Sequence, residues 1–303
     1  METHDTELML RPEYTLVILD RLVNRGDSIN LVGEKGTGKS RLIDDLRRCS
    51  PGQVKILFAD IKAYKRAFNK LLEDFAGQLG LAGSPAGSLG TIFAGIENRP
   101  GRFLVLLDNY DALLGNPDLD PGYTETFFTD LNALKNKDNV SLLCTSCIVH
   151  HSRPVYIAGN TLTSPLSLDI DTLPPLTFNE IDNEILRRLD EYHRLDLQTH
   201  PGDREMITKA IHGQEFPYPA LKWYCAKLNG QNEEERALPF KKKFQRWKKA
   251  FKKNARTGME KGLYKMSSKV EGLAIAAKAN KIKIPILSDL RKLIDKWTGK
   301  LAS

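Results

Sequence analysis

Eight consecutive residues near the N-terminus have the types and spacing of a phosphate-binding loop. They run from Gly33 to Ser40 as Gly-Glu-Lys-Gly-Thr-Gly-Lys-Ser and match G-x-x-x-x-G-K-[ST] at every fixed position. In such a loop the glycines let backbone N–H groups curl round phosphate oxygens, Lys39 reaches the β- and γ-phosphates, and the Ser40 hydroxyl ligates Mg²⁺. The sequence therefore predicts a site for ATP and Mg²⁺ rather than a plain glycine-rich turn. We expect the site to be lined by Gly33, Glu34, Lys35, Gly36, Thr37, Gly38, Lys39, Ser40 and Arg41.

A carboxylate suited to the magnesium site stands at the end of an apolar run. Residues 102–107 read Arg-Phe-Leu-Val-Leu-Leu, and Asp108 follows directly. A strand-end carboxylate beside a phosphate loop holds the water shell of the magnesium ion. We therefore expect Ser40 and Asp108 to form the metal site. The alternative for Asp108 is a helix cap.

Two hydroxyl side chains follow the next apolar run, 140–144. A hydroxyl at Thr145 or Ser146 would lie beside the magnesium strand and could sense the γ-phosphate, the alternative being an ordinary strand-end cap. We place Thr145 with Lys39, Asp108 and Asp111 among the catalytic residues. The arginine that reaches a phosphate, in this or a neighbouring subunit, stays open among Arg153, Arg187 and Arg188.

Strands and helices that alternate along the chain must position these residues. Apolar patterns predict strands at 28–33, 54–58, 102–107 and 140–144, and helices at 11–23, 39–48, 62–79 and one that ends at 130–134. This alternation predicts an α/β fold with a parallel sheet. The phosphate loop follows a strand and opens a helix, whose N-terminal dipole adds to the anion site.

The loop and the two polar strand ends, taken in this order, resemble the AAA+ and STAND branch of P-loop ATPases. This branch contains origin-recognition-type, archaeal-type and NACHT-like ATPases. Residues 173–181, Leu-Pro-Pro-Leu-Thr-Phe-Asn-Glu-Ile, are similar to the entry of its helical lid, and 213–222, Gly-Gln-Glu-Phe-Pro-Tyr-Pro-Ala-Leu-Lys, to its glycine-proline lid motif near the nucleotide. The resemblance covers residues 11–230. It implies a parallel-sheet P-loop ATPase core, a helical lid, and a homo-oligomer with ATP at the subunit interface.

The chain departs from the family pattern directly after Asp108. Hydrolysing relatives carry Glu there, as the base that orients the attacking water, whereas Asn109 cannot accept a proton. Asp111 could serve as that base or as a second ligand of the metal shell, as in the NACHT-like version. It could equally be a surface acid that caps a helix over 112–114. The departure implies an ATPase that hydrolyses slowly and uses ATP as a switch.

The remaining chain is expected to be helical, with helices at 179–192, 204–211 and 219–228. We predict three domains: a nucleotide-binding α/β domain at 1–172, a helical lid at 173–230, and a basic, mainly helical C-terminal region at 231–303. Within the last, a helix–strand–helix pattern over 270–297 fits part of a winged-helix or another DNA-reading module.

Charge is segregated along the chain. The 303 residues carry a net charge of +7, but from Phe240 onward there are 19 Lys+Arg and 4 Asp+Glu, a net of +15. The residues before it carry 26 and 34, a net of −8. In 240–253 aromatic residues recur on one helical face, lysines fill the other faces, and no acid is present. We therefore predict nucleic acid, with DNA preferred, as the partner of 240–256; an acidic protein, an anionic membrane and mere solubility are the alternatives.

Other classes of protein are disfavoured. No apolar run approaches the roughly 18 residues of a membrane span, and residues 1–10 do not resemble a secretory signal. The four cysteines include one C-x-x-C pair without a second pair for zinc, so we expect a reduced, cytoplasmic chain.

Three functions compete. The first is an ATP-controlled assembly switch on nucleic acid, such as a DNA-associated regulator or loader. The alternative is a STAND-like signalling or defence ATPase that assembles with a separate protein effector. A metabolic kinase is disfavoured, because no acceptor-activating acid stands out and the basic tail has no use there.

Overall fold

The computed structural model describes residues 8–81, 88–97, 99–157, 160–163, 166–191, 201–231 and 238–254. The chain divides into two compact units between Lys222 and Trp223. The division falls inside one helix, so the three-domain arrangement expected from the sequence stays a prediction. The helix–strand–helix pattern over 270–297 lies outside the described residues.

A five-stranded parallel sheet forms the centre of the first unit. Its order is β2-β3-β4-β1-β7, and every neighbouring pair is parallel. The strands are β1 (Ile29–Val32), β2 (Val54–Asp60), β3 (Arg102–Asp108), β4 (Val140–Ser146) and β7 (Asp169–Thr172). The predicted α/β fold with a parallel sheet is confirmed. Strand β7 was not predicted, because an edge strand that reads Asp-Ile-Asp-Thr lacks the apolar run of a buried strand.

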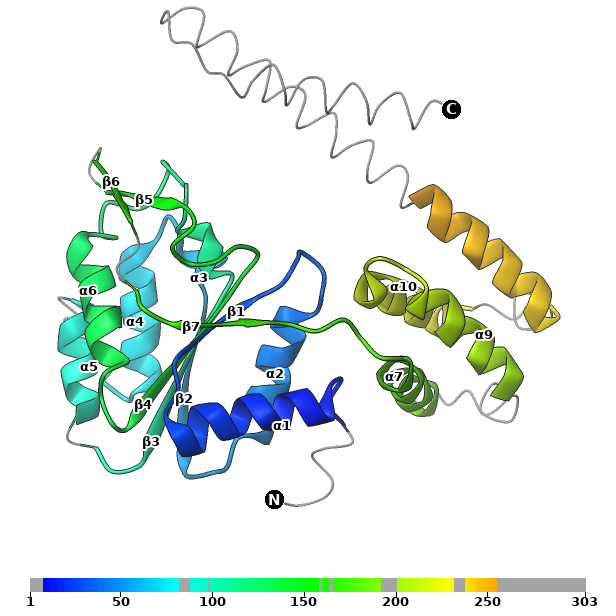
Figure 1. The fold of residues 1–303 in the computed structure, drawn as a ribbon, viewed down its shortest axis with the longest axis horizontal. Helices are drawn as coiled ribbons and strands as arrows, with labels where there is room; N and C mark the ends of the chain where they lie inside the picture. Colours follow the sequence, from blue (N-terminus) through cyan, green and yellow to red (C-terminus); the bar gives the residue numbers. More distant parts are fainter. Residues whose placement is uncertain are drawn as a thin grey trace, which may run out of the picture. The chain divides into compact units, whose positions relative to one another are not determined.

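Helices cover both faces of this sheet (Figure 1). One face carries α1 (Pro12–Asp20), its π-helical extension η2 (Arg21–Arg25) and α2 (Lys39–Cys49); the other carries α4 (Phe68–Gln78), α5 (Leu89–Glu97) and α6 (Glu125–Leu134). The alternation of strand side chains serves both layers. In β3, Phe103, Val105 and Leu107 pack toward α4–α6, whereas Leu104 and Leu106 pack toward α1 and α2.

Two stretches differ from the sequence-based expectation. The helix expected over 62–79 is two helices, α3 (Ile61–Tyr64) and α4, because the chain turns at 65–67 and Ala67 leaves the helical region with φ −149° and ψ 61°. Helix α5 was not predicted. A β-hairpin, β5 (Pro154–Ile157) and β6 (Asn160–Thr163), was also not predicted.

The helices expected after Pro174 are present. They are α7 (Phe178–Glu191), α9 (Pro201–His212) and α10 (Pro217–Asn229). Thr177 and Glu180 start α7 with reciprocal caps: the Thr177 N–H donates to Glu180 Oε2 at 2.7 Å, and the Glu180 N–H donates to Thr177 Oγ1 at 3.2 Å. Within the described part of the chain, no helix combines the length and apolar character that a bilayer span requires.

The second unit contains the end of α10 and a helix at 240–254. The predicted aromatic face of this helix forms its core: Phe244 and Trp247 are buried, and Phe244 and Phe251 lie against the ring of Tyr224 at 6.0 and 5.8 Å between centroids. The lysines on the other faces are exposed to solvent, except Lys243, which is buried.

Candidate functional site

The phosphate-loop residues connect β1 to α2 as predicted. Gly36 and Gly38 have φ of 86° and 99°, a left-handed conformation that glycine adopts without strain. A Cβ on Gly33 would lie 2.9 Å from Thr37 Oγ1, so the backbone also needs glycine there for space. Helix α2 begins at Lys39, which leaves its first N–H groups directed into the loop. A cradle of this kind fits phosphate groups.

The ammonium group of Lys39 lies inside this loop. Its Nζ donates to the carbonyl oxygens of Gly33 at 2.6 Å and Glu34 at 3.0 Å, and it lies 3.6 Å from the sulfur of Cys147. The side chain is only 7% exposed, and none of these partners is an acid. A buried cation held by neutral groups alone is a strong binding point for an anion.

The ends of β3 and β4 bring Asp108 and Thr145 together. Asp108 is buried, and Thr145 Oγ1 donates to its Oδ1. The N–H of Asn109 donates to Thr145 Oγ1 at 3.1 Å and to Asp108 Oδ1 at 3.0 Å. Because β4 lies between β3 and β1, this polar group ends beside the strand that leads into the phosphate loop. Oxygen ligands of this kind suit Mg²⁺.

The two hydroxyls that the sequence left open are now distinguished by their contacts. Ser146 accepts a hydrogen bond from Asn30 Nδ2 at 2.8 Å and donates to the carbonyl oxygen of Ile148 at 2.5 Å. Its hydroxyl is therefore used in tying β4 to β1. Thr145 is the residue that faces Asp108.

Asp111 follows this group closely in sequence. It falls in a single 3₁₀ turn, η3 (Tyr110–Ala112), rather than at the start of a longer helix. Among the residues that the structure describes, no hydrogen bond joins its carboxylate to Asp108, Asn109 or Thr145. An acid that sequence reasoning missed, Asp60 at the end of β2, instead accepts a hydrogen bond from Asn109 Nδ2 at 2.9 Å. The strand-end position of Asp60 was its only sequence signal.

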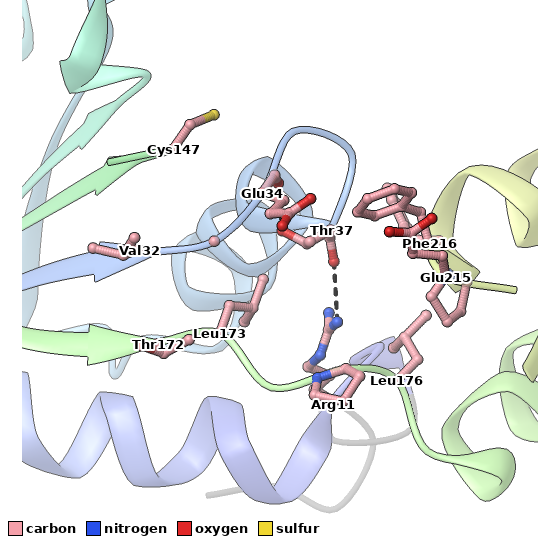
Figure 2. Close-up of a pocket in the computed structure, with 14 residues that line it drawn as sticks. Arg11, Val32, Glu34, Thr37, Cys147, Thr172, Leu173, Leu176, Glu215 and Phe216 are labelled. Atoms are coloured by element: carbon pink, nitrogen blue, oxygen red, sulfur yellow. Dashed lines mark hydrogen bonds between the residues drawn. The ribbon is translucent and has the colours of Figure 1, made fainter. Parts of the chain in front are cut away.

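A cavity of about 340 Å³ opens beside the phosphate loop (Figure 2). The two segments expected to resemble lid motifs both reach it. Its walls are Arg11, Val32, Gly33, Glu34, Thr37, Cys147, Thr172, Leu173, Pro175, Leu176, Glu215, Phe216, Pro217 and Tyr218. Apolar walls with a few polar groups beside a phosphate cradle suit a nucleoside.

Arg11 is a wall residue of this cavity that sequence reasoning read only as a helix start. It is 2% exposed, and its Nη2 donates to the carbonyl oxygens of Thr37 at 3.0 Å and Pro174 at 3.2 Å. Within the described part of the chain, its Nε and Nη1 are buried without a hydrogen-bond partner, and burial lowers the pKa of its guanidinium. Two orphaned donors at the cavity wall fit the acceptor atoms of a nucleotide.

Arg41, expected in the nucleotide site, has its side chain engaged elsewhere. Its guanidinium donates to Asp45 at 2.8 Å and to Glu184 of α7 at 3.4 Å. Glu184 is buried and also pairs with Arg187 and Arg188. Burial alone would raise the pKa of Glu184. Hydrogen bonding by Arg187 and the charge of Arg41 outweigh burial and hold the pKa of Glu184 below its ordinary value. The network joins the helix after the phosphate loop to the first helix after the sheet.

The arginine candidates differ in exposure. Arg187 and Arg188 are engaged by Glu184 and Glu191 within the chain. Arg153 is exposed, and its side chain lies beside the backbone of Gly115.

The helix at 240–254 presents a charged outer surface. Its exposed cations are Lys241, Lys242, Arg246, Lys248, Lys249, Lys252 and Lys253. Lys243 is the exception in this run, because it is buried and its Nζ donates to Gln231 Oε1 at 3.2 Å.

Comparison with solved structures identifies the fold. A Walker-type ATPase of Pyrococcus abyssi matches with a TM-score of 0.56 and 16% identity, over 94% of this chain and 89% of that one. The Orc1 protein of Aeropyrum pernix, solved in complex with DNA, matches with a TM-score of 0.51 and 13% identity, over 97% of this chain and 84% of that one. No family model and no curated protein sequence matches the chain. The predicted resemblance is confirmed at the level of the fold: the chain shares its α/β fold with both of these proteins.

Proposed function

We propose that this chain, which has the AAA+ P-loop fold, binds ATP with Mg²⁺, hydrolyses it slowly, and uses it as a nucleotide-controlled assembly switch on DNA. The observation that carries the proposal is the position of Lys39, a buried ammonium group inside a glycine loop and held by carbonyl oxygens alone. On binding, phosphate oxygens would take the place of these weaker partners, which gives the loop its preference for a polyanion.

The residues at the strand ends have distinct roles in this scheme. Ser40 and Asp108 would hold Mg²⁺, which neutralises charge on the phosphates. Thr145 donates a hydrogen bond to Asp108, through which it would keep that carboxylate oriented, and it would sense the γ-phosphate. The cavity walls, with the donors of Arg11, would hold the base and sugar.

The contacts of Arg41 support a switch rather than a simple binding site. Arg41 directly follows the phosphate-loop serine, and its guanidinium pairs with Glu184 of α7. The cavity is also lined by Leu176, which lies just before α7, and by Tyr218, in the first turn of α10. A ligand that contacts both sets of residues would change the free energy of their arrangement, which is what a nucleotide switch requires.

DNA is the partner that the outer surface of the 240–254 helix favours. Its exposed lysines lie on a helix whose aromatic face is already buried, so the charges have no role in the core. Clustered Lys and Arg bind phosphate backbones by releasing counterions, without requiring base contacts. The Orc1 protein matched above was solved with DNA, which agrees with this choice. Homo-oligomer formation on DNA, with Arg153 facing a neighbouring nucleotide, belongs to the same proposal.

Nucleotide binding is tested with a fluorescent ATP analogue and Lys39→Ala. We expect the variant to lose affinity by about 100-fold or more, because it removes a buried charge that faces the phosphates. Lys70→Ala, at an exposed lysine of α4, is the matched control and should bind like the wild type. Full binding by Lys39→Ala would contradict the assignment of the site.

DNA binding is tested by filter binding across a salt series, with and without a non-hydrolysable ATP analogue. Lys248→Ala combined with Lys252→Ala should lower affinity for duplexes of every sequence and reduce the slope of log K against log salt by about two. Lys62→Ala combined with Lys70→Ala is the control for loss of two surface lysines. If the wild type has no DNA affinity at low salt but retains a protein on purification, the STAND-like alternative with a separate protein effector is favoured instead.

A further inference from the structure

Two neighbouring strands end in carboxylates at the same level of the sheet. The register of β2 and β3 pairs Asp60 with Asp108, both at the carboxyl ends of their strands. Only Asp108 was assigned a role above, because the sequence gives no reason to single out a second strand-end acid. The structure shows what Asp60 contacts.

Asp60 is joined to Asp108 and Thr145 through one residue, Asn109. Asp60 Oδ1 accepts hydrogen bonds from Asn109 Nδ2 at 2.9 Å and from the Lys62 N–H at 3.1 Å. The Asn109 N–H in turn donates to Thr145 and Asp108. A continuous chain of hydrogen bonds therefore runs from β2 through Asn109 to the Asp108–Thr145 pair.

The backbone at position 109 explains why this residue is not a glutamate. Asn109 has φ 55° and ψ 40°, and among the described residues it is the only one besides glycine with positive φ. Asn and Asp tolerate this left-handed conformation better than longer side chains do. A carboxylate at 109 would also face the carboxylate of Asp60, and like charges at hydrogen-bond distance repel. Asn109 satisfies both constraints, and the pair then carries one negative charge, located on Asp60.

We propose that Asp60 and Asn109 together orient the attacking water in ATP hydrolysis, in place of the single acid that hydrolysing P-loop enzymes carry after the strand-end aspartate. The inference rests on the proposed function. The Nδ2 group of Asn109 donates to Asp60, which leaves the carboxamide oxygen as the atom that would accept a hydrogen bond from the water. Asp60 is the positioning residue: it fixes the amide and supplies the negative charge.

The chemistry balances without a proton acceptor at position 109. The water oxygen forms a bond to the γ-phosphorus, and the bond from that phosphorus to the β–γ bridging oxygen breaks, so ADP leaves. A proton of the water passes to the transferred phosphoryl group, which is released as inorganic phosphate. Because the carboxamide orients the water but takes no proton, slow turnover is expected.

The test measures phosphate release and nucleotide affinity for Asp60→Asn, Asn109→Asp and the two exchanges combined. Asp60→Asn keeps the size of the side chain and an oxygen for the Lys62 N–H, so the fold is preserved. We expect kcat to fall by about 10- to 100-fold with ATP affinity within about twofold of the wild type. Asn109→Asp should also lower kcat, through repulsion between two carboxylates. The combined exchange restores one acid and one amide and should recover most of kcat.

The outcomes separate this inference from the proposed function. Three outcomes would overturn the role of Asp60 while leaving ATP binding intact. They are an unchanged kcat in Asp60→Asn, no recovery of kcat in the combined exchange, and a loss of kcat in Asp111→Asn but not in Asp60→Asn. A wild type that binds ATP without turnover also overturns it. A wild type that does not bind ATP overturns the proposed function as well. Asp118→Asn, at an exposed acid that pairs with Arg66, is the control for loss of one carboxylate.

Discussion

Arg11 and Thr37 are joined by a hydrogen bond of 3.0 Å from the Arg11 Nη2 to the carbonyl oxygen of the phosphate loop (Figure 2). The same Nη2 donates to the carbonyl oxygen of Pro174, so one buried guanidinium links the residue before α1, the phosphate loop and the segment after β7. Three parts of the chain that meet at the nucleotide cavity thus share one side chain. A ligand that binds in this cavity and contacts Arg11 would therefore affect all three segments.

Arg11→Met is expected to weaken ATP binding by about tenfold, equivalent to about 1.4 kcal/mol. The reason is that Nε and Nη1 have no hydrogen-bond partner among the residues that the structure describes, so acceptor atoms of the ligand would satisfy them. The measurement is titration with a fluorescent ATP analogue, alongside thermal unfolding without ligand. Arg66→Met, at an exposed arginine, is the control. Equal ATP affinity in Arg11→Met and the wild type would show that the orphaned donors do not face the ligand.

Thr145→Val should destabilise the protein by about 1–2 kcal/mol and lower ATP turnover. Valine has the same shape but removes the hydroxyl that donates to Asp108 and accepts from the Asn109 N–H. Of the two hydrogen bonds that the buried Asp108 carboxylate accepts within the described residues, it then loses one and keeps the one from the Asn109 N–H. Thr145→Ser keeps the hydroxyl and should retain most of both properties. Urea unfolding and phosphate release measure the two effects.

Thr129→Val is the control that separates the effect of Thr145→Val from the effect of removing any threonine hydroxyl. Thr129→Val removes an exposed hydroxyl on α6 that donates to a carbonyl of its own helix, and it should change stability by less than about 0.5 kcal/mol. If Thr145→Val matched this control in both assays, Thr145 would have no role in holding Asp108.

The central strands and the phosphate loop were predictable because their signals are local. Four strands are apolar runs, and the loop is a fixed pattern that needs no knowledge of the rest of the chain. Strand β7 and the β5–β6 hairpin are short and half-exposed, so their pattern does not differ from that of a loop. Arg11 could not be recognised, because an arginine in sequence is expected on the surface and its burial depends on packing.

The Asp60–Asn109 pair shows a second limit. The two residues are 49 apart in sequence, and their contact depends on the register of β2 against β3 and on the left-handed backbone at 109. The sequence showed only that an acid was missing at 109 and offered Asp111 as the nearest replacement. Closeness in sequence therefore could not identify Asp60, which contacts Asn109 from the neighbouring strand of the sheet.

Glu184→Gln is expected to lower the free energy of unfolding at neutral pH by about 1–3 kcal/mol. The buried carboxylate pairs with Arg41, Arg187 and Arg188. The neutral amide removes the negative charge that these three guanidinium groups share, and leaves them only their pairs with Asp45 and Glu191. Urea unfolding at neutral pH measures the loss. Glu191→Gln, at an acid that is 43% exposed, should cost less than about 0.5 kcal/mol.

The stabilisation by Glu184 should also depend on pH in a defined direction. Its pKa in the folded protein is held below the ordinary value of 4.5, so the unfolded carboxyl takes up a proton at a higher pH than the folded one. Its contribution is therefore complete above pH 4.5 and is lost as the pH falls below that value. The difference in unfolding free energy between the wild type and Glu184→Gln should shrink across this range. A difference that stayed constant down to pH 3 would mean that the charge of Glu184 contributes nothing.

Trp247→Ala should lower the stability of the second unit by about 3 kcal/mol, because a large buried ring is removed from its core. Lys249→Ala, two positions later on the exposed face, should change stability by less than about 0.5 kcal/mol. Circular dichroism during thermal unfolding measures both.

The two variants should affect DNA binding in different ways. Lys249→Ala lowers the affinity for DNA and its salt dependence at all temperatures. Trp247→Ala lowers the affinity only at temperatures where the helix at 240–254 unfolds. Equal loss of DNA affinity in both variants at a temperature where both remain folded would show that the aromatic face itself contacts the DNA.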